Sequence, residues 1–486
     1  MLTEAELLAK VPTGLYIGGK WVEGSHENGI NVEDPATGKT LLTIANATAE
    51  DGLKALTAAA DTQGSWAKTS PRERAEILRR TFEIVRDRAE EFAMLISLEM
   101  GKPLAEARGE VTYGNEFVRW FSEEAARIGG RFGSNPEGTG KMLITKRPVG
   151  PAFAITPWNF PLAMATRKIA PAIAAGCTMV VKPAELTPLT TMLFVSVLEE
   201  AGLPAGVINV INTSTSAATS APIIADSRLR KITFTGSTRV GVKLLEQAAQ
   251  NVLRTSMELG GNAPFLVFED ADLDAAVTGA MQAKMRNIGQ ACTAANRFIV
   301  HESVADEFAS KFATKMAELN LGRGVAEGTT CGPVINKAAQ DNMQRLVDLT
   351  VKEGGDVVTG GTSTGDEGYF FKPTVLANVP EDASILKEEI FGPVAPIVRF
   401  KTEEDAVRIA NNTEYGLVSY AFTKDLARGM RLVDSLESGM SGINTGLVSN
   451  AAAPFGGVKQ SGLGREGGAE GIEEYLETRY VLIPNL

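Results

Sequence analysis

The sequence predicts an α/β protein built around two open sheets of mostly parallel strands. From about residue 150 onward, short apolar runs alternate with stretches of helical pattern, as expected for strands that helices cover on both faces. The runs form two series, the first ending at Phe234 and the second beginning at Pro264. A chain of 486 residues is also too long for one compact core, so we expect two or three domains.

The part of the chain before this alternation indicates short strands, turns and one long helix. Turn residues at Gly18-Gly19 and 35–38 divide the first fifty residues. Ser70-Pro71-Arg72-Glu73 predicts a helix start, with a capping box and proline at the first helical position. Apolar residues then recur at helical spacing and predict a long amphipathic helix: Leu78, Phe82, Val85, Ala89, Phe92 and Ile96.

Each of the two series predicts particular strands and helices. The strands expected in the first series are residues 152–155, 178–181, 207–211 and 231–234. The helices expected between them are residues 165–176, 189–202 and 239–250. In the second series we expect strands at 264–268 and 395–400, and helices near 273–286 and 303–318. The Gly- and Thr-rich residues 359–368 predict a surface loop.

Composition excludes several classes of protein. The net charge of −11 argues against nucleic acid and anionic membranes as partners, and no apolar run is long enough to span a bilayer. The acidic N-terminus, residues 1–6, does not have the pattern of a signal peptide. Three scattered cysteines and two histidines are too few for a disulfide framework or a zinc site. We therefore expect a cytoplasmic, reduced and metal-free protein.

Cys292 is the leading candidate for a catalytic nucleophile. It follows Gly289 and precedes Thr293, surroundings that favour an exposed and mobile thiol. Glu258 lies between apolar residues and a Gly-Gly turn, where partial desolvation would raise its pKa toward that of a general base. A nucleophile and a base together allow chemistry through a covalent thioester. The competing interpretation is packing, because free cysteine is among the most often buried residues.

Two segments at strand ends are candidates for a dinucleotide site. Thr235-Gly236-Ser237 follows a strand and opens a helix, so backbone N–H groups and a hydroxyl can face a phosphate. The spacing to Gly241 imitates a P-loop, but Val242 stands where such a loop has lysine, which excludes a Walker site. Lys182-Pro183-Ala184-Glu185 ends another strand, where ligands of open α/β sheets bind. Taken singly, each segment could equally be a packing turn or a solvated charge pair.

A third segment imitates a nucleotide-binding loop near the C-terminus. Residues 462–467 match the pattern Gly-x-Gly-x-x-Gly. No strong strand precedes them, and too little chain follows to build the βαβ unit that such a loop requires. The sequence therefore argues against a nucleotide loop at this position.

Six motifs in this order resemble the NAD(P)-dependent aldehyde dehydrogenase superfamily and together cover most of the chain. They are Thr156-Pro157-Trp158-Asn159-Phe160-Pro161, Lys182-Pro183-Ala184-Glu185, Phe234-Thr235-Gly236-Ser237, Glu258-Leu259-Gly260-Gly261, Gly289-Gln290-Ala291-Cys292 and Glu389-Ile390-Phe391-Gly392-Pro393-Val394. Within the superfamily the sequence is most similar to the succinate-semialdehyde dehydrogenases, through residues 165–168, 284–287, 442–450 and 454–466.

This resemblance implies an aldehyde dehydrogenase-like fold in three parts. An atypical Rossmann-like domain for the dinucleotide would comprise residues 1–126 and 149–256. A catalytic domain would comprise residues 257–455. Residues 127–148 and 456–486 would form a small β flap and tail that join subunits into a homodimer or homotetramer.

The resemblance also implies catalytic and cofactor-binding roles. Cys292 would attack an aldehyde, Glu258 would activate water, and Asn159 with the Cys292 backbone N–H would hold the oxyanion. Asn159 could instead be a turn residue. Glu185 favours NAD over NADP, because a carboxylate binds the ribose 2′-OH and repels a 2′-phosphate. The implied cofactor-binding residues are Thr156, Pro157, Trp158, Lys182, Pro183, Ala184, Glu185, Thr235, Gly236, Ser237, Leu259, Glu389 and Phe391.

The expected substrate is an aldehyde that carries a carboxylate at its far end. Arg167 and Arg286 lie in segments that flank catalytic residues, and an arginine fork can bind a carboxylate through two bonds. The resemblance assigns both arginines, together with Ser449, to this carboxylate. Succinate semialdehyde is the expected substrate, and glutarate and 2-oxoglutarate semialdehydes are the open alternatives.

Three other classes of protein compete with this interpretation. An acylating dehydrogenase would pass the acyl group to coenzyme A, but the carboxylate of Glu258 favours water as the acceptor. A cysteine hydrolase needs a histidine, and only His26 and His301 are present. A non-catalytic protein would keep only the fold, which the presence of both nucleophile and base disfavours.

Overall fold

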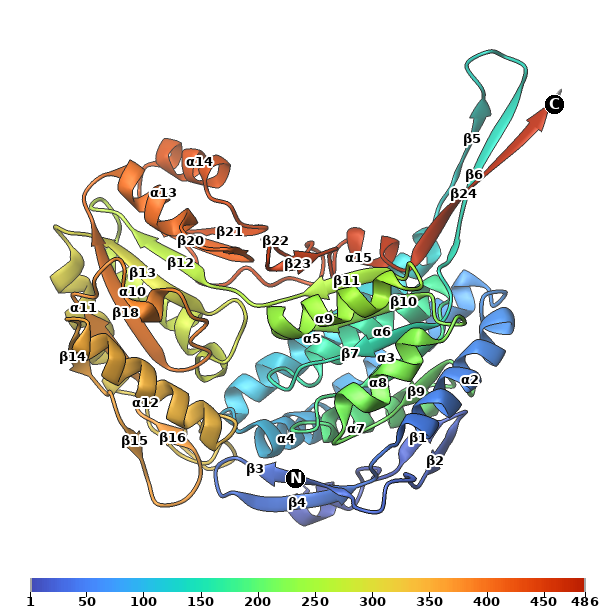
Figure 1. Ribbon diagram of the computed structural model, residues 1–486, viewed down its shortest axis with the longest axis horizontal. Coiled ribbons are helices and arrows are strands. Elements are labelled where there is room, and N and C mark those ends of the chain that lie inside the picture. Colours follow the sequence, from blue (N-terminus) through green and yellow to red (C-terminus); the bar gives the residue numbers. More distant parts are fainter. Residues whose placement is uncertain (1, 485–486) are drawn as a thin grey trace.

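The computed structural model describes residues 2–484 as two lobes, each built on a sheet, and a narrow ribbon of strands that projects from one of them (Figure 1). One lobe contains most of the first 260 residues, and the other contains most of the remaining chain. Strands β3 (Ile30–Asp34) and β4 (Lys39–Ile44) form a hairpin that runs beneath both lobes in this view. Within residues 2–484, no helix combines the length and the apolar character that crossing a membrane would require.

The first sheet has the strand order of a dinucleotide-binding fold. Its edges are β1 (Leu15–Ile17) with β2 (Lys20–Val22), and β23 (Gly462–Leu463), which pair antiparallel. The central order β9-β8-β7-β10-β11 reverses between β7 and β10, and ligands of open α/β sheets bind at the carboxyl ends of strands at such a reversal. The five central strands are parallel: Ile208–Val210, Met179–Lys182, Ala152–Ile155, Lys231–Thr235 and Arg254–Glu258. The sequence predicted the first four, and it did not predict β11.

Alternating residues of these strands enter two separate apolar cores, as the period of a strand requires. Phe153 and Val180 face one core, and Ala154 and Val181 face the other. The first core is closed by α2 (Ala49–Trp66), α8 (Ser216–Ala225) and α9 (Thr238–Ala249). The second is closed by α6 (Ala163–Ala175) and α7 (Leu189–Glu200). Helices α3 (Pro71–Asp87), α4 (Ala89–Met100) and α5 (Leu104–Glu124) pack outside them. Every residue of α6 is buried, because helices cover it as well as the sheet.

The second sheet contains six parallel strands and one antiparallel edge strand, β14 (Asp356–Thr359). In the order β17-β18-β13-β12-β20-β21, the parallel strands are Thr374–Ala377, Val394–Phe400, Ala295–His301, Ala263–Val267, Val418–Phe422 and Met440–Ile443. The expected helices are present as α10 (Leu273–Met285) and α11 (Ala305–Ala317), which cover one face. The sheet is also covered by α12 (Lys337–Lys352), α13 (Glu403–Asn411) and α14 (Leu426–Ser435).

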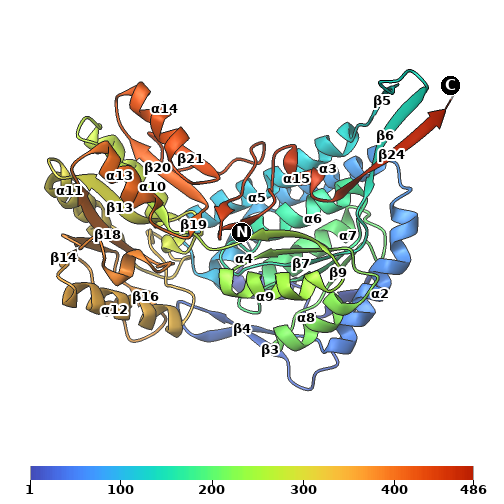
Figure 2. The same ribbon diagram turned by 45° about the horizontal axis from the view of Figure 1, so that its top comes forward.

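The projecting ribbon is a three-stranded antiparallel sheet in the order β24-β6-β5 (Figures 1 and 2). It consists of β5 (Arg131–Ser134), β6 (Gly140–Pro148) and β24 (Leu476–Pro484), so its strands come from the two expected segments. The rest of the expected tail lies elsewhere. Strand β22 (Val458–Lys459) pairs with β19 (Tyr415–Gly416), and β23 joins the first sheet. The exact division of the chain into domains stays a proposal.

The long helix predicted beyond Ser70 is wrong, because the structure has two helices there. They are α3 (Pro71–Asp87) and α4 (Ala89–Met100), separated at Arg88, whose backbone angles (φ −105°, ψ 19°) lie outside the helical range. Apolar spacing alone did not reveal this break. The predicted capping box is half present: the Ser70 hydroxyl accepts a bond from the Glu73 N–H, while the Glu73 side chain is turned to solvent.

Several elements carry no clear signal in the sequence. The N-terminus forms a one-turn helix, α1 (Glu4–Leu8), and α5 (Leu104–Glu124) is the longest helix of the described residues. The expected loop at 359–368 contains β15 (Ser363–Thr364), which forms a hairpin with β16 (Phe370–Phe371). Short helical turns occur at η1 (Ala125–Arg127), η2 (Arg286–Gly289), η3 (Ser384–Leu386) and α15 (Glu470–Glu473).

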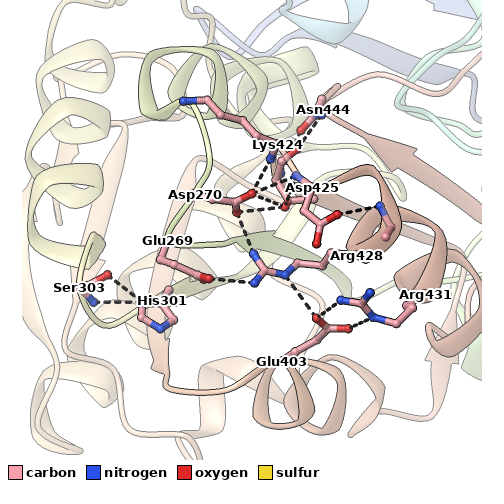
Figure 3. A network of polar contacts seen from close by, with 12 residues as sticks. Glu269, Asp270, His301, Ser303, Glu403, Lys424, Asp425, Arg428, Arg431 and Asn444 are labelled. Carbon is pink, nitrogen blue, oxygen red and sulfur yellow. Dashed lines mark hydrogen bonds and ion pairs between the residues drawn. The ribbon is translucent and has the colours of Figure 1, made fainter.

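A charged network fixes α13 and α14 to the second sheet (Figure 3). Arg428 on α14 pairs with Glu269 and Asp270 at 2.8 Å and with Glu403 of α13 at 3.3 Å. The Asp270 carboxylate also accepts bonds from the backbone N–H groups of Lys424 and Asp425 ahead of α14. Each carboxylate is therefore paired with an arginine, and the network joins α13 and α14 to the end of β12.

We expect Arg428→Ala to destabilise the protein by about 2 kcal/mol, because it leaves three carboxylates of the network without their shared cation. The measurement is the midpoint of thermal unfolding at a fixed scan rate. Arg431→Ala is the matched control, because the Arg431 side chain is 53% exposed and its pair with Glu403 should contribute less than about 1 kcal/mol. Equal shifts for the two variants would contradict a central role for Arg428.

Candidate active site

A cavity of about 240 Å³ brings together side chains from both lobes at the carboxyl ends of β7 and β10. It contains Cys292 and Asn159 together with Arg167, Arg286 and Ser449, so the two predicted sets of catalytic and substrate-binding residues meet in one place. Its lining is Tyr113, Pro157, Trp158, Asn159, Phe160, Met164, Arg167, Thr235, Gly236, Ser237, Leu259, Gly260, Arg286, Ala291, Cys292, Thr293, Glu389, Phe391, Ser449 and Phe455.

Cys292 lies between η2 and β13, and its thiol is partly buried. The expectation of an exposed thiol is therefore wrong, because the loop after Glu258 packs on the cysteine. A Cβ added at Gly261 would lie 2.5 Å from the Cys292 carbonyl oxygen, so only glycine permits this approach. Burial raises the pKa of Cys292 to about 12, with Arg167 opposing it, and the thiol is neutral at neutral pH.

A left-handed turn carries the chain from the end of α10 to Cys292. Asn287 and Ile288 have φ values of 57° and 60°, and Gly289 follows with a φ of 75°. Non-glycine residues adopt this conformation at a cost of about 1–3 kcal/mol each, and only where surrounding contacts enforce it. A Cβ at Gly289 would lie 2.2 Å from the Gly392 carbonyl oxygen, so glycine is required here for space as well.

Asn159 lies in the loop between β7 and α6, with 5% of its surface exposed. Its side-chain amide donates to the carbonyl of Gln290 at 2.9 Å, which holds the amide against the loop that carries Cys292. The Asn159 carbonyl accepts bonds from Lys102 at 3.0 Å and from the Asn287 amide at 2.8 Å. Hydrogen bonds on both sides of Asn159 thus join two loops that come from different sheets.

Glu258 ends β11 and is 3% exposed, so the predicted desolvation of this carboxyl group is confirmed. Burial and the neighbouring Glu466 raise its pKa well above the ordinary value, while Arg167 and Lys168 oppose the shift. Glu258 does not line the cavity; Leu259 and Gly260 do. Its Oε2 atom is buried without a hydrogen-bond partner among the described residues, so it can accept a bond from a water molecule or a proton.

Glu466 balances two cations behind the cavity. Its carboxylate lies 2.7 Å from Arg167 and also pairs with Lys168, whose ammonium donates to the Thr235 hydroxyl at 2.7 Å. Burial opposes ionisation of Glu466, but Lys168 and Arg167 outweigh it and lower the pKa of Glu466. The pKa values of the two buried acids are thus shifted in opposite directions, which favours ionisation of Glu466 and protonation of Glu258.

The two predicted arginines differ in their surroundings. Arg167 is 1% exposed, pairs with Glu466, and stacks on Phe455 at 3.9 Å. Arg286 stacks between Tyr113 and Phe160, at 5.2 and 5.0 Å, and donates to the Ser449 hydroxyl at 3.3 Å. Among the residues that the structure describes, no carboxylate lies within ion-pair distance of Arg286. Arg286 can therefore receive an anionic ligand, whereas the charge of Arg167 is already balanced.

The strand ends beside the cavity provide a place for phosphate groups. Helix α9 begins directly after Thr235-Gly236-Ser237, and the Ser237 side chain caps none of its N–H groups. The first turn of α9 therefore keeps its donors and the positive end of its dipole for an anion. Thr156 at the end of β7 bonds through its N–H to the Lys182 carbonyl, which aligns the ends of β7 and β8.

The end of β8 carries four more of the predicted residues, at positions 182–185. Lys182 is 4% exposed, and its ammonium lies 3.2 Å from the Pro183 carbonyl and 4.0 Å from the half-exposed Glu185 carboxylate. Lys182, Pro183, Ala184 and Glu185 lie outside the cavity lining, along the crevice of the first sheet.

Glu389 and Phe391 precede β18 of the second lobe and also line the cavity. The Glu389 carboxylate accepts a bond from the Gly261 N–H at 3.2 Å, and burial raises the pKa of Glu389 to about 7. Phe391 meets Trp158 edge-on at 5.4 Å. The two aromatic rings thus close the cavity where the lobes meet.

The other cysteines and the histidines lie away from the cavity. Cys177 and Cys331 are buried, and burial raises the pKa of Cys177 to about 11. His301 bonds to Ser303 and to the Lys401 carbonyl, and His26 to Asn28. Within residues 2–484, no group of three His, Cys, Asp or Glu side chains is arranged to hold a metal ion.

Sequence reasoning missed five residues that shape the site. Tyr113 and Phe160 enclose Arg286, Lys168 and Glu466 compensate the charge near Glu258, and Lys102 holds Asn159. Glu466 lies inside the segment that imitates a nucleotide loop, and β23 of that segment pairs with β11 beside Glu258. The Gly-rich run at 462–467 therefore packs beside Glu258, and the charged residue Glu466 within it was the signal that could have revealed this.

Comparison with known proteins identifies the relatives of this chain. The model of the aldehyde dehydrogenase family matches residues 21–481. A succinate-semialdehyde dehydrogenase of Paenarthrobacter nicotinovorans is 61% identical over 441 residues, which are 91% of this chain and 98% of that protein. A glutarate-semialdehyde dehydrogenase of Pseudomonas putida is 46% identical over 468 residues, covering 96% of this chain and 97% of its own length.

Solved structures agree with this relationship. The crystal structure of an NADP-dependent enzyme of Escherichia coli superposes with a TM-score of 0.97 at 44% identity, covering 100% of both chains. A betaine aldehyde dehydrogenase of Staphylococcus aureus in complex with NAD+ superposes with a TM-score of 0.96 at 34% identity, covering 99% of this chain and 97% of its own. The sheet order, the cavity and these matches agree, and the chain belongs to the aldehyde dehydrogenase family.

Proposed function

We propose that this protein oxidises succinate semialdehyde to succinate with NAD or NADP as the hydride acceptor. The observation that carries the proposal is Arg286, which forms no ion pair among the described residues and lines the same cavity as Cys292. An aldehyde with a distal carboxylate can place its carbonyl carbon at Cys292 and its carboxylate at Arg286. The 61% identical relative from Paenarthrobacter nicotinovorans, a succinate-semialdehyde dehydrogenase, supports this substrate.

In this proposal the chemistry passes through a covalent bond to Cys292. The thiol attacks the aldehyde carbon to form a thiohemiacetal, and the Asn159 amide with the Cys292 backbone N–H stabilises the oxyanion. A bound nicotinamide dinucleotide supplies the acceptor for the hydride that leaves this carbon. Water activated by Glu258 then hydrolyses the resulting thioester and releases the acid.

The protonation states of Cys292 and Glu258 set the order of events. Burial raises the pKa of both groups and so favours the neutral form of each. Glu258 must lose its proton before it can act as a base, and the cations Arg167 and Lys168 favour that loss. Glu466 opposes it, because a second negative charge in the same buried region is unfavourable.

The crevice of the first sheet fits a dinucleotide. The uncapped first turn of α9 would receive the pyrophosphate, and Lys182 with Glu185 would reach the adenosine ribose. Glu389 and Phe391 would hold the nicotinamide ribose and ring beside Cys292. The remaining members of the proposed site would contact the dinucleotide through side chain or backbone: Thr156, Pro157, Trp158, Pro183, Ala184, Thr235, Gly236, Ser237 and Leu259.

The substrate carboxylate would bind to Arg286 and Ser449. Arg167 borders the same space, but its pair with Glu466 makes it a weaker partner for an anion. The Pseudomonas putida relative acts on glutarate semialdehyde, which is one methylene longer, so that substrate is the second candidate. A carboxylate at Glu258 favours water over coenzyme A as acyl acceptor, and the distant histidines argue against a cysteine hydrolase.

The projecting ribbon is proposed to join subunits into a dimer or tetramer. Its outer strands β5 and β24 have unpaired edges, which form a ready surface for another chain. Phe132, Tyr480 and Leu482 on these strands are 59%, 55% and 49% exposed. Exposed apolar groups on an unpaired edge are typical of a surface that another subunit covers.

Replacing Cys292 by Ala is expected to abolish oxidation, whereas Glu258→Gln should stop the reaction at the thioester. The reason is that the thiol of Cys292 is needed to attack the aldehyde, whereas Glu258 is needed only later, to activate the water that hydrolyses the thioester. In rapid mixing, Glu258→Gln should release one NADH per active site in a burst, and its steady-state rate should fall by about 100-fold or more.

Glu246→Gln, an exposed substitution on α9, is the matched control and should turn over at the normal rate. Because the pKa of Glu258 is raised, steady-state turnover limited by hydrolysis should increase with pH as this group loses its proton. Full turnover without the Glu258 carboxylate would remove it as the base.

Arg286→Ala should lower kcat/KM for succinate semialdehyde by about 100-fold, because a charged hydrogen-bonding partner of the carboxylate is lost. The loss with butanal, which has no carboxylate, should stay below about 3-fold. Arg167→Ala is the comparison: it unbalances Glu466 beside Glu258 and should impair both substrates alike. A loss for Arg286→Ala that is equal with both aldehydes would refute the carboxylate site.

The enzyme should prefer NAD to NADP, because the Glu185 carboxylate repels a 2′-phosphate on the adenosine ribose. Measuring kcat/KM for both dinucleotides tests this directly. Glu185→Ser should shift the ratio toward NADP by about 10-fold, since one repulsive charge at a half-exposed position is removed. A wild-type preference for NADP would mean that Glu185 turns away from the ribose.

A further inference from the structure

The left-handed turn before Cys292 is held by a residue that no part of the proposed reaction uses. The Glu106 carboxylate accepts a hydrogen bond of 2.5 Å from the backbone N–H of Asn287, the first residue of that turn. Glu106 lies in the first turn of α5, where an acid commonly does no more than favour the helix dipole. Here the carboxylate contacts a loop 181 residues further along the chain.

A second acid on the same face of α5 holds the other reacting loop. Glu110, four residues after Glu106, accepts bonds from the backbone N–H groups of Leu162 and Ala163 where α6 begins. It also pairs with Lys102 at 2.5 Å, and Lys102 donates to the Asn159 carbonyl. One face of α5 thus contacts both the segment that carries Asn159 and the segment that leads to Cys292.

The contact between Glu106 and Asn287 has a specific mechanical consequence. Asn287 and Ile288 both hold positive φ values, which a β-branched residue adopts only under constraint. The Asn287 side chain, placed by this turn, donates to the carbonyls of Asn159 and Gln290. Without the bond from Glu106, the turn can relax toward an ordinary backbone conformation, and Cys292 would move relative to Asn159.

We propose that Glu106 is a positioning residue for the oxidation, which holds Asn287 so that Cys292 and Asn159 face the same carbonyl group. The inference rests on the proposed role of Cys292 as nucleophile. Since the carboxylate acts by accepting a hydrogen bond at a fixed distance, the length of the side chain matters more than its charge. A glutamine at this position keeps an acceptor oxygen at that distance, whereas an aspartate keeps the charge and withdraws it by one methylene.

The experiment measures kcat and kcat/KM of Glu106→Asp, Glu106→Ala and Glu106→Gln with succinate semialdehyde and with butanal. Glu106→Asp and Glu106→Ala should lose about 10- to 100-fold in kcat with both aldehydes, because misplaced reacting groups affect every substrate. Glu106→Gln should stay within about 3-fold of wild type. The alkylation rate of Cys292 by iodoacetamide should change in the same two variants.

Arg108→Ala is the matched control, because Arg108 lies on α5 and pairs only with the exposed Glu90. Thermal unfolding of each variant separates loss of positioning from loss of fold. Overturning results are an activity of Glu106→Asp equal to that of Arg108→Ala, or a loss in Glu106→Gln as large as in Glu106→Ala. A failure of the proposed function itself would be seen in a different experiment: the Cys292→Ala variant would still oxidise the aldehyde.

Discussion

The geometry of the reacting groups depends on two backbone carbonyl oxygens, those of Asn159 and Gln290. The Asn159 amide and the Asn287 amide both donate to Gln290, and Asn287 with Lys102 donates to Asn159. These bonds join segments 131 residues apart, one after a strand of the first sheet and one before a strand of the second. Because buried amides and carbonyls must be paired, neither loop can shift without leaving polar groups unsatisfied. Cys292 and Asn159, the proposed nucleophile and oxyanion donor, are therefore held in place by the same small ring of hydrogen bonds.

The buried charges behind the cavity are those of two cations, Arg167 and Lys168, and the carboxylate of Glu466 between them. Arg167, Lys168 and Glu466 pair closely, so the cations that could lower the pKa of Glu258 are already partly engaged. Burial then favours the protonated form of Glu258, which has to lose its proton before it can act as the proposed base. A Cβ at Gly456 would lie 3.0 Å from the Glu258 Oε1 atom, so the C-terminal segment covers the carboxyl group closely and maintains this desolvation. Segments far from Glu258 in the sequence thus determine how strongly its pKa is raised.

The sequence predicted well whatever follows from local patterns. Six of the parallel strands, β7, β8, β9, β10, β12 and β18, appear as apolar runs, whereas β11, β13, β17, β20 and β21 were not predicted. Cys292, Glu258 and Asn159 stand in short motifs that the sequence alone reveals. The break at Arg88 was missed because apolar spacing continues across it. The burial of Cys292 and the pairing of Arg167 with Glu466 could not be predicted either, since both result from contacts between segments far apart in the chain. Glu106 carried no signal at all, because an acid in the first turn of a helix is ordinary.

The left-handed turn connects the proposed carboxylate anchor, Arg286, to the proposed nucleophile, Cys292. Arg286 precedes the turn and Cys292 follows it, so one short segment holds both the proposed anchor for the carboxylate and the atom that attacks the aldehyde. The distance between these two groups decides how many methylenes separate the carboxylate from the carbonyl in a substrate that binds productively. Tyr113 and Phe160 fix the guanidinium from both sides, which prevents Arg286 from adjusting to a longer chain at little cost. The same backbone conformation that places the proposed nucleophile therefore also sets the separation between Cys292 and Arg286 that a substrate has to span.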